Sequence, residues 1–344
     1  MRIIQFTPSL TPTGPVSVAL DLGSTLRQLG HEVSFWFLDE KENAVDEKGE
    51  RVSVRSLPIQ NDIDIIHSHG LRPDMALSRL FKRFRSFRTV TTVHNLVDED
   101  LKHQYSPLVS RVYSPLWVRS MRRHDARVTL TPSMAEYYRT KWRMDSKVIP
   151  NTRIVQPGEP DQEIVQELRE FRGDGILLGS ISYLTSRKGL DQAIRLLQRD
   201  PNYRLVIFGT GGESQNLKTL ASEIGVTDRV WFAGHQSDAR KYLPFMDVLV
   251  MPSHSEGFPL SMLEAIQSGT PVVGSSIPAF TEAFNDDEVP TFPIGDIEKF
   301  HETIQRTLKD REGFIARSRE HFERSYSPMV IGKAYLELYQ SLLS

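Results

Sequence analysis

The sequence predicts an α/β protein built from two Rossmann-like domains. In residues 1–152, short apolar runs rich in β-branched residues alternate with longer amphipathic segments, and the same alternation starts again at residue 174. This pattern is typical of parallel sheets with helices on both faces. Between the two stretches, residues 153–173 lose the alternation, and three prolines fall in residues 150–173. We therefore expect a first domain at 1–152, a linker with a short helix at 153–173, a second domain at 174–326 and a C-terminal helix at 327–344.

The first domain opens with a strand, a helix that Gly30 caps, and a second strand. Its later strands are apolar and bounded by turn residues, as buried strands are. Strands are expected at Arg2–Phe6, His31–Leu38, Ile63–Ser68, Arg88–His94, Arg127–Thr131 and Lys147–Ile149, with a weaker signal at Arg51–Leu57; helices are expected at Val16–Leu29, Pro73–Phe84 and Pro107–His124.

The second domain repeats this order and ends in a helical tail that begins at Ile297. The last of the tail's three helical pieces, Val330–Leu343, keeps an apolar stripe at helical spacing. Strands are expected at Gly175–Ile181, Arg204–Phe208, Val230–Ala233 and Val248–Met251 and from Pro271 onward; helices are expected at Gly189–Leu197, Gly212–Ile224, Asp238–Phe245 and Pro259–Gly269.

Composition indicates a globular protein without thiol chemistry. The chain has 344 residues, 39% of them hydrophobic and 25% charged, and no cysteine, which excludes disulfides, thiolate metal sites and cysteine nucleophiles. The N-terminus lacks a signal-peptide pattern, and no apolar run approaches the roughly 20 residues of a membrane span. These features predict a cytoplasmic protein.

The charge is uneven along the chain although the net charge is only −2. Residues 71–153 carry 17 Lys and Arg against 7 Asp and Glu, and aromatic residues are interleaved with the basic ones in Phe81–Arg88 and Val118–Arg123. Such segments suit an anionic membrane surface or a polyanion, or they form a solvated helix face. We expect peripheral contact with the inner face of the cell membrane as one alternative and no nucleic-acid partner.

Residues 253–276 combine two carboxylates with the start of a helix. A buried strand ends at Met251, the loop that follows carries Glu256, and the helix expected from Pro259 carries Glu264. Backbone N–H groups at a helix start bind phosphate oxygens, and a carboxylate accepts two hydrogen bonds from a sugar diol. A nucleotide sugar has both groups. In the alternative interpretation, Glu256 caps the helix and Glu264 is solvated.

Other motifs follow in a fixed order. A Pro/Gly loop after the first strand is followed by LGHEV, IIHSHG, TTVHN, VIPN, SRKGL, FGTGGE, VWFAGH and EGFPLSMLEAIQSGTPVV. Together they cover nearly the whole chain, and the set resembles the retaining, two-domain (GT-B) glycosyltransferases of family 4. The resemblance implies two Rossmann-like domains that face each other across a cleft, with the C-terminal helix returning to the first. It assigns acceptor binding to the first domain and nucleotide-sugar binding to the second.

The resemblance also implies roles for individual residues of this chain. Arg187 and Lys188 match the basic pair that holds the donor diphosphate, and cations there would neutralise the leaving group as its charge grows. His94 matches a histidine that lies near the transferred sugar and donates to its hydroxyl. Donor contacts fall on Gly14, Gly257, Phe258, Leu260, Ser261 and Glu264, with Glu264 at the ribose, the Leu260 and Ser261 N–H groups at the phosphates, and Glu256 at the donor sugar.

The chain departs from the family pattern at two places. The first loop reads Thr13-Gly14-Pro15 where the family often has adjacent glycines, and Pro15 removes one backbone donor. After the first domain, Pro150-Asn151-Thr152 stands where the family has Pro-Asn-Gly. Asn can itself adopt the left-handed conformation that glycine favours.

We expect no cofactor and no metal ion. His67 and His69 lie on one face of a strand, but no third ligand is evident, so we favour loop packing or acceptor contact over a metal site. Asp62-Ile63-Asp64 begins a strand and Asp98-Glu99-Asp100 is expected in a loop, so neither forms an Asp-x-Asp motif at a strand end.

The sequence thus predicts a hexosyltransferase-type enzyme that moves a sugar from a nucleotide diphosphate sugar, UDP- or GDP-linked, to a glycan or lipid-linked glycan hydroxyl with retention. The basic and aromatic segments of the first domain favour an acceptor in bacterial cell-surface polysaccharide or glycolipid synthesis. Two alternatives stay open. One is a sugar-nucleotide-binding protein without turnover. The other is a dinucleotide oxidoreductase, suggested by Gly209-x-Gly211 after a strand and Asp228 nineteen residues later, although Ser214 occupies the third glycine position.

Overall fold

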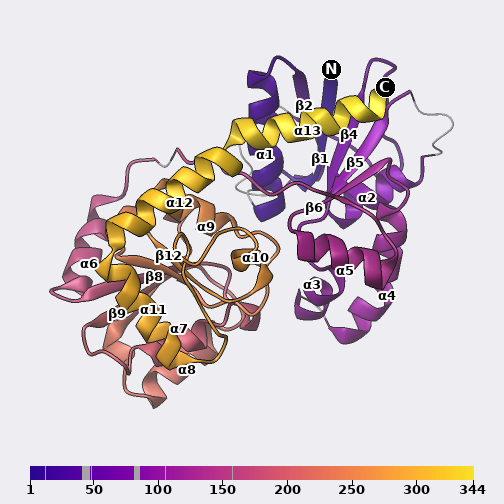
Figure 1. Ribbon diagram of the computed structural model, residues 1–344. Helices are drawn as coiled ribbons and strands as arrows, with labels where there is room; N and C mark the ends of the chain where they lie inside the picture. Colours follow the sequence, from indigo (N-terminus) through magenta and orange to yellow (C-terminus); the bar gives the residue numbers. More distant parts are fainter. Residues whose placement is uncertain (12, 41–46, 48, 81–85, 105, 157) are drawn as a thin grey trace. The chain divides into compact units, whose positions relative to one another are not determined.

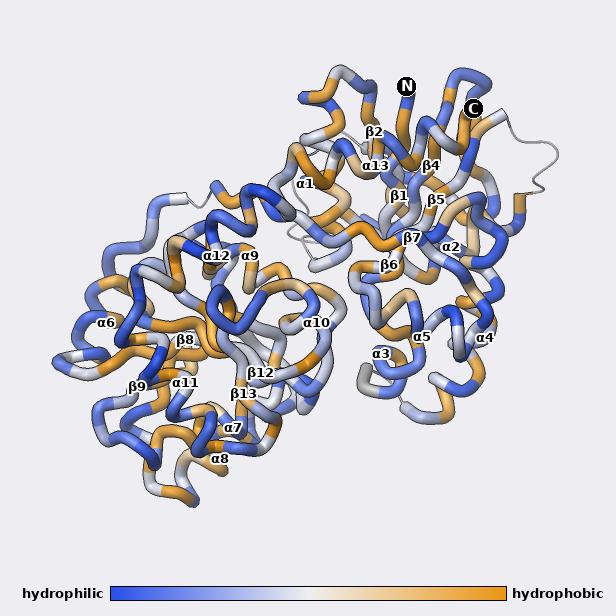
Figure 2. Tube along the Cα trace, in the orientation of Figure 1, coloured by the Kyte–Doolittle hydropathy of each residue, from blue (hydrophilic) through white to orange (hydrophobic). Residues whose placement is uncertain are grey.

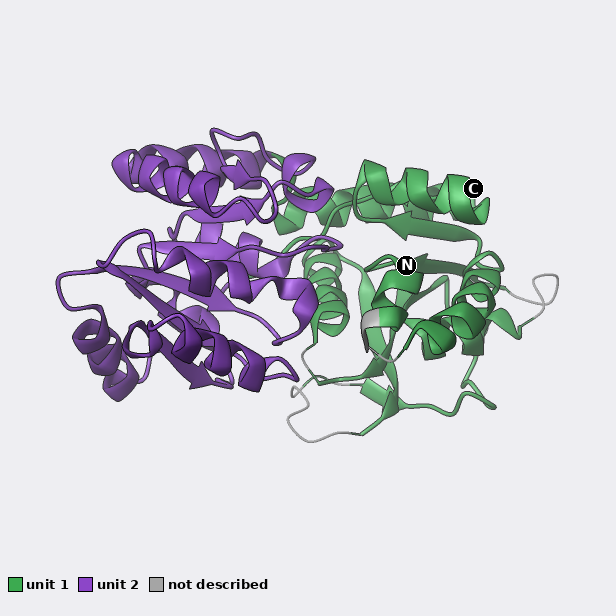
Figure 3. Ribbon diagram, turned by 90° about the horizontal axis from the view of Figure 1, so that it is seen from below, with its two compact units in different colours: residues 1–154, 325–344 green, residues 155–324 purple. Residues whose placement is uncertain are grey.

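The computed structural model describes the chain except residues 12, 41–46, 48, 81–85, 105 and 157. Contacts divide it into two compact units (Figure 3). Unit 1 comprises Met1–Ile154 and Ser325–Ser344, and unit 2 comprises Val155–Arg324. Each unit is described by itself.

Unit 1 is built on a seven-stranded sheet in the order β3-β2-β1-β4-β5-β6-β7, and every described strand pair in it is parallel. The central strands are buried on both faces, which is why their sequences are nearly continuous apolar runs. The strands are β1 Arg2–Ser9, β2 Glu32–Asp39, β3 Gly49–Arg51, β4 Ile65–His69, β5 Arg88–Thr92, β6 Ala126–Thr129 and β7 Lys147–Val148.

The helices of unit 1 include one from the far end of the chain. Helix α13 lies beside α1 (Figure 1), and its Ile331, Tyr335 and Tyr339 belong to the same core as the residues of β1 and β5. The helices are α1 Gly14–Gln28, α2 Leu71–Ser78, α3 Val97–Gln104, α4 Pro107–Met121, α5 Pro132–Trp142 and α13 Pro328–Leu343.

Unit 2 contains a second parallel sheet of six strands in the order β10-β9-β8-β11-β12-β13. The trace around β8 and β9 is largely hydrophobic (Figure 2), and this agrees with the complete burial of residues such as Leu178 and Val206. The strands are β8 Ile176–Ile181, β9 Tyr203–Phe208, β10 Val230–Gly234, β11 Val248–Met251, β12 Val272–Ser275 and β13 Thr291–Phe292.

Helices pack around this second sheet. Phe300 and Ile304 of α11 join the core that β8, β9 and β11 form. The α-helices are α6 Gln162–Arg172, α7 Leu190–Leu196, α8 Ser214–Glu223, α9 Leu260–Gln267, α10 Pro278–Thr281, α11 Ile297–Lys309 and α12 Arg311–Ser325; short 3₁₀ helices are η2 Ser186–Lys188, η3 Thr227–Arg229 and η4 Ala239–Phe245.

The α/β class and the two parallel sheets confirm the predicted fold class, but several local predictions were wrong. The strand expected at Arg51–Leu57 is replaced by β3, a short exposed strand that ends at Arg51. Asp98-Glu99-Asp100 lies in the first turn of α3 and not in a loop, because acidic side chains stabilise a helix start. Pro259 is the N-cap of α9 and not its first helical residue. Of the basic segment Phe81–Arg88, residues 81–85 lie outside the described part.

Each sheet has one place where the strand order reverses. In unit 1 it lies between β1 and β4, and in unit 2 between β8 and β11. At such a point the loops after two neighbouring strands run to opposite sides and leave room for a ligand at the carboxyl ends. Among the described residues, no helix has the length and apolar composition needed to cross a membrane.

Candidate functional site

A cluster of charged side chains lies at the point in unit 2 where the strand order reverses. Lys188 Nζ donates to Glu256 Oε1 at 2.6 Å, and Arg187 Nη1 lies 3.7 Å from Glu256 Oε2. The two cations come from η2, after β8, whereas the carboxylate comes from the loop after β11. Lys188 lies 68 residues before Glu256 in the sequence and Arg187 directly precedes Lys188, so side chains that are distant in the sequence converge here.

The backbone holds these two loops together. Gly189 follows the basic pair with a φ of +58°, and a Cβ there would lie 2.1 Å from the carbonyl oxygen of Pro252. Only glycine allows this approach. The His254 N–H also donates to the Arg187 carbonyl at 2.8 Å, and the Arg187 guanidinium donates to the Ser255 carbonyl at 3.3 Å. The positions of the cations are thus fixed by main-chain packing.

The cluster carries one net positive charge in a largely desolvated place. The side chain of Glu256 is 6% exposed, and those of Arg187 and Lys188 are 18% and 17% exposed. Burial tends to raise the pKa of Glu256, but the charges of Lys188 and Arg187 and a hydrogen bond from Ser253 outweigh it, so the pKa lies below its usual value. Glu256 is therefore ionised at neutral pH, and the cations remain available to an additional anion.

Helix α9 starts next to this cluster. Its first residues, Leu260 and Ser261, follow Pro259, and N–H groups in a first helical turn have no partner within the helix. Gly257 and Phe258 are buried in the preceding loop. Glu264 is 8% exposed on α9, which excludes the interpretation that it is an ordinary solvated glutamate. A buried carboxylate one to two turns from a helix start suits a ligand with both phosphates and hydroxyls.

Unit 1 has a different polar cluster where its own strand order reverses. His94 follows β5 and is half-buried, and its Nε2 lies 3.1 Å from Nδ1 of His69 at the end of β4. The other ring nitrogen of His69 lies 2.8 Å from Oε1 of Gln5 on β1. Three adjacent strands thus supply one hydrogen-bonded chain of side chains.

A second chain of hydrogen bonds runs beside the first and joins the strands to α13. His67 Nδ1 bonds to the Tyr339 hydroxyl at 2.8 Å, and His67 Nε2 bonds to Thr92 Oγ1 at 2.8 Å. Thr92 in turn bonds to the Tyr335 hydroxyl at 2.9 Å. The two tyrosines were predicted only as part of an apolar stripe, because their partners are more than 240 residues away in sequence.

These histidines are neutral at physiological pH. Burial lowers the pKa of His94 to about 3, and it lowers those of His67 and His69 well below the usual range, with further repulsion from neighbouring histidines. His67 and His69 are completely buried in β4, so the expectation of loop packing or acceptor contact was wrong. In the described ranges, no group of three or more His, Asp or Glu side chains is arranged so that it could hold a metal ion.

The remaining predicted residues have structural settings of their own. Gly14 is the first residue of α1, and a Cβ there would meet nothing within 4 Å, so packing within unit 1 does not require a glycine. Asn151 is buried, and it is not in the left-handed region, because Arg143 is the one non-glycine residue with positive φ in the described chain.

The glycines of the dinucleotide-like motif have a packing role. A Cβ on Gly211 would lie 2.2 Å from the Leu184 carbonyl oxygen, and Leu184 N–H donates to the Thr210 carbonyl at 2.9 Å. The motif therefore brings the loop after β9 against the loop after β8. This packing accounts for Gly211 without a dinucleotide.

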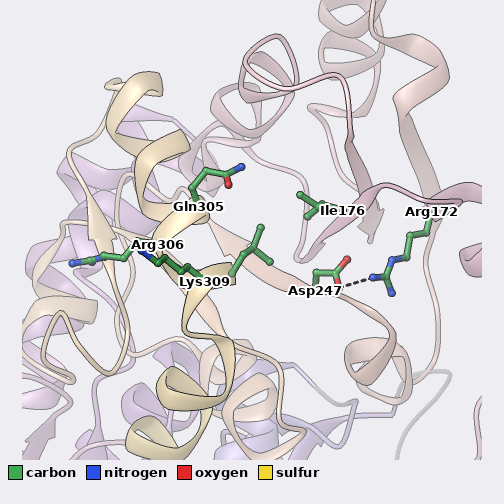
Figure 4. A pocket seen from close by; sticks show the side chains of 7 residues that line it. Arg172, Ile176, Asp247, Gln305, Arg306 and Lys309 are labelled. Carbon is green, nitrogen blue, oxygen red and sulfur yellow. Dashed lines mark ion pairs between the residues drawn. The ribbon is translucent and has the colours of Figure 1, made fainter.

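Unit 2 also contains a cavity of about 770 Å³, and Figure 4 shows the side chains that line it. It is lined by Ile176 at the start of β8 and by Asp247 just before β11, so it is at the amino ends of the strands. Asp247 pairs with Arg172 at 2.9 Å and accepts the Leu177 N–H at 2.8 Å. Ligands of doubly wound sheets bind at the opposite edge, so we assign this cavity a structural role.

Each unit is an α/β unit with a parallel sheet. One has a cationic site at a helix start, and the other has a histidine at a strand end. This combination defines a GT-B glycosyltransferase. The model for glycosyl transferases group 1 matches residues 161–325, and the model for glycosyltransferase family 4 matches residues 12–152. The chain belongs to this glycosyltransferase family.

Individual relatives support the assignment over the full length. The chain is 31% identical over 360 residues to the O-antigen biosynthesis glycosyltransferase WclY of Escherichia coli, covering 99% of both. It is 31% identical over 236 residues to the lipopolysaccharide core biosynthesis glycosyltransferase LpsE of Rhizobium meliloti, covering 66% of this chain and 67% of the relative.

Solved structures show the same fold. Anabaena HepE in complex with UDP and glucose matches with a TM-score of 0.80 at 16% identity, covering 99% of this chain and 100% of HepE. WaaG, a glycosyltransferase involved in lipopolysaccharide biosynthesis, matches with a TM-score of 0.68 at 16% identity, covering 98% of this chain and 99% of WaaG.

Proposed function

We propose that this protein transfers a sugar from a nucleotide diphosphate sugar to a hydroxyl of a glycan or lipid-linked glycan, with retention at the anomeric carbon. The observation that carries the proposal is the cluster of Arg187, Lys188 and Glu256 next to the start of α9. Its two cations and the helix N–H groups can bind a diphosphate. Its carboxylate can accept hydrogen bonds from sugar hydroxyls. A UDP-sugar or a GDP-sugar is the donor we favour, and solved neighbours bind UDP or UDP-glucose.

Each side chain has a distinct role in this proposal. Arg187, Lys188 and the Leu260 and Ser261 N–H groups hold the diphosphate, and Glu264 accepts hydrogen bonds from the ribose. Glu256 contacts hydroxyls of the donor sugar. Lys188 and Arg187 keep Glu256 ionised, so it is an acceptor at neutral pH. His94 contacts a hydroxyl of the transferred sugar.

The reaction proceeds by front-face attack in this proposal. The bond between the anomeric carbon and the diphosphate oxygen breaks, the acceptor oxygen bonds to the same face of the carbon, and the departing phosphate oxygen takes the acceptor proton. Arg187 and Lys188 stabilise the charge that develops on the leaving group, so no metal ion is required. Closure of the protein around the donor excludes water from the reacting carbon.

A panel of nucleotide sugars tests donor binding. A ligand that binds only the folded state raises the melting temperature by mass action. UDP-, GDP-, ADP- and TDP-sugars should therefore separate into one that stabilises the protein and several that do not. The Lys188→Gln variant, measured in parallel, should lose this shift. No shift with any donor would contradict the proposal, and a shift with NAD(P)H instead would favour an oxidoreductase.

Two further measurements test the chemistry once a donor is known. The anomeric configuration of the first product, read by the proton coupling constant in NMR before mutarotation, should equal that of the donor. Turnover after exhaustive EDTA treatment should equal turnover with added Mg²⁺ or Mn²⁺. An inverted product or loss of activity in EDTA would overturn retention or metal independence, respectively.

The relatives support a place in bacterial cell-surface polysaccharide or glycolipid synthesis. WclY acts in O-antigen biosynthesis, and LpsE acts in lipopolysaccharide core biosynthesis. We therefore favour an acceptor that is a membrane-associated glycan intermediate. Transfer to lipid-extracted acceptor fractions, compared with transfer to free monosaccharides, would distinguish a lipid-linked acceptor from a soluble one.

Helix α4 has the surface that contact with an anionic membrane needs. Leu108, Val112 and Leu116 recur every four residues and are 71%, 51% and 48% exposed. Arg111 and Arg119 are exposed on the same helix, and Arg122 follows its end. An amphipathic helix with exposed leucines and arginines binds at the headgroup boundary of anionic bilayers.

Liposome sedimentation tests this contact. The wild type should sediment with vesicles that contain anionic lipid at low salt, and replacement of Arg111 and Arg119 by Glu should abolish sedimentation. Substitution of exposed arginines on unit 2, such as Arg195→Glu on α7, serves as the control and should leave it unchanged. Absence of binding for the wild type would overturn the membrane contact and leave sugar transfer untouched.

A further inference from the structure

The ring of His94 is held by another histidine. His94 Nε2 lies 3.1 Å from His69 Nδ1, and the ring centroids are 5.3 Å apart with a 31° angle between the planes. His69 has no exposed surface, and its second nitrogen bonds to Gln5. His94 itself is half-buried at the end of β5. The bond thus links a fixed, interior ring to one that reaches the strand end.

The hydrogen bonds also determine where the protons lie. A neutral imidazole has one donor and one acceptor nitrogen. The Gln5 amide is oriented with Oε1 toward His69 at 2.8 Å, and with this orientation His69 carries its proton on Nε2 and presents Nδ1 as an acceptor. His94 must then carry its proton on Nε2 to bond to His69. The second nitrogen of His94, Nδ1, is consequently its acceptor.

We propose that His69 is a positioning residue that fixes the ring orientation and the Nε2–H tautomer of His94. It rests on the proposed function in one respect, namely that His94 contacts a hydroxyl of the transferred sugar. In that contact Nδ1 of His94 accepts a hydrogen bond from the hydroxyl, which is the reverse of the direction that the family resemblance implies. A ring held in one orientation and one tautomer meets the sugar without reorganisation, and such preorganisation increases the rate of the chemical step.

The neighbouring chain of hydrogen bonds provides a contrast within the same cluster. His67 stacks beside His69 with ring centroids 4.3 Å apart, but its nitrogens bond to Tyr339 and Thr92 and not to His94. Tyr339 also interacts with Gln5, whereas the Tyr335 hydroxyl bonds to Thr92, so a change at Tyr335 disturbs the buried cluster and leaves the hydrogen bonds among Gln5, His69 and His94 in place. This substitution therefore distinguishes an effect on the orientation of His94 from a general loss of packing in the cluster.

Two substitutions at His69 test the proposal directly. The amide of asparagine lies near the place of imidazole Nδ1, and the amide of glutamine lies near that of Nε2. His69→Asn should keep a partner for His94, whereas His69→Gln should keep only the partner for Gln5. We expect kcat to fall about 10- to 100-fold in His69→Gln with the donor KM changed less than about threefold, and His69→Asn to recover most of kcat. Equal kcat in the two variants would overturn the proposal.

Tyr335→Phe is the matched control for stability. It should lower the melting temperature and leave kcat within about twofold, because it removes a hydroxyl from the same buried cluster. If kcat in Tyr335→Phe falls as far as in His69→Gln, the effect of His69 is one of packing and the proposal fails.

Imidazole NMR gives a measurement that does not depend on activity. In protein labelled with ¹⁵N-histidine, long-range ¹H–¹⁵N spectra distinguish the two tautomers, and the His94→Gln variant assigns the signals of His94. The wild type should show His94 as a single Nε2–H tautomer, and His69→Gln should show a mixture. A mixture or the Nδ1–H form in the wild type would overturn the proposal. If no nucleotide sugar binds, the proposed function fails while these spectra still decide the role of His69.

Discussion

The two units place polar clusters of opposite character at equivalent positions in their sheets. Unit 1 has an uncharged, almost completely buried cluster at the end of β4 and β5, whereas unit 2 has a charged and partly exposed one after β8 and β11. Both lie where the strand order reverses. One fold therefore supports two kinds of site, and the difference lies in the side chains at the carboxyl ends of the strands.

In the proposed function, the two clusters have different roles. Neutral hydrogen bonds in a buried place resist reorganisation, so the histidine cluster suits the positioning of a sugar. A charged cluster stabilises a leaving group only if its cations are incompletely neutralised, and Arg187 and Lys188 share a single carboxylate, Glu256. We therefore expect the stability of unit 1 to depend on pH and the turnover number to depend on the charges of unit 2.

The largest expected effect is loss of stability of unit 1 in mild acid. The native pKa values of His67, His69 and His94 lie below the unfolded value of about 6.5, so only the unfolded state gains these protons as the pH falls below 6.5. Burial raises the pKa of Asp74 to about 6, so the native state takes up a proton at Asp74 before the unfolded state does. This proton offsets one of the three that the unfolded state gains at the histidines. A net difference of two protons over roughly 1.5 pH units lowers the free energy of unfolding by about 4 kcal/mol between pH 6.5 and 5.

Hydrogen exchange measured by mass spectrometry checks this expectation peptide by peptide. After correction for the intrinsic exchange rate, peptides from β4 and β5 should lose protection between pH 7 and pH 5. Peptides from β8 and β9 of unit 2 serve as the internal control and should lose much less. Equal losses in the two units would remove the contrast between a neutral and a charged cluster.

Removal of one cation from unit 2 should have the next largest effect. Lys188→Gln leaves Glu256 with Arg187 as its remaining cation and takes one charge from the leaving-group site. We expect kcat to fall about 10²- to 10³-fold, the range seen when one stabilising donor is removed from a transition state. The fall in kcat is measured by steady-state kinetics with the donor that thermal stabilisation identifies. Lys299→Gln, on an exposed lysine of α11 that pairs with Glu302, should retain wild-type kcat; similar kinetics in both variants would show that Lys188 does not hold the diphosphate.

The two glutamates of unit 2 should separate by the parameter that each changes. Glu264→Gln should raise the Kd of the nucleoside diphosphate about 10- to 100-fold, because a hydrogen bond to a charged group contributes about 1.5–3 kcal/mol. Glu256→Gln should lower kcat by a similar factor with that Kd changed less than about threefold. Calorimetric titration and steady-state kinetics measure the two quantities. Small and equal changes in both variants would mean that the carboxylates only support the loop and helix.

The comparison also shows how far the sequence could predict the structure. The α/β class and most strands were predictable, because strands buried on both faces are continuous apolar runs. Helix α3 was missed, since a short acidic helix has no clear apolar period, and β3 was misplaced because its three residues are all exposed. Such elements are stabilised by contacts with neighbouring segments, and those contacts are not visible in local sequence.

Candidate residues were easier to predict than their partners. Residues His94, Arg187, Lys188, Glu256 and Glu264 were identified from motifs, and the structure brings Arg187 and Lys188 to Glu256. No motif indicated Gln5, Tyr335 or Tyr339, because their hydrogen bonds join segments that are adjacent only after folding. The sequence signal that could have found the tyrosines is their place in a stripe otherwise made of aliphatic residues. A buried Tyr needs a partner for its hydroxyl, and His67 and Thr92 are polar residues of buried strands.

The smallest expected effect comes from removing one hydroxyl in each unit. Tyr335→Phe removes the 2.9 Å hydrogen bond to Thr92, which keeps His67 as a partner, and Ser253→Ala removes the 2.8 Å hydrogen bond to Glu256, which keeps Lys188. Each deletion should change one free energy by about 1 kcal/mol, that of unfolding in Tyr335→Phe and that of activation in Ser253→Ala. In the neutral cluster the loss should appear as lower stability of unit 1 with unchanged kcat, whereas in the charged cluster it should appear as a several-fold lower kcat with unchanged stability. Hydrogen exchange and kinetics on both variants measure the two outcomes, and an exchange of these outcomes would show that the neutral cluster acts in turnover and the charged one in folding.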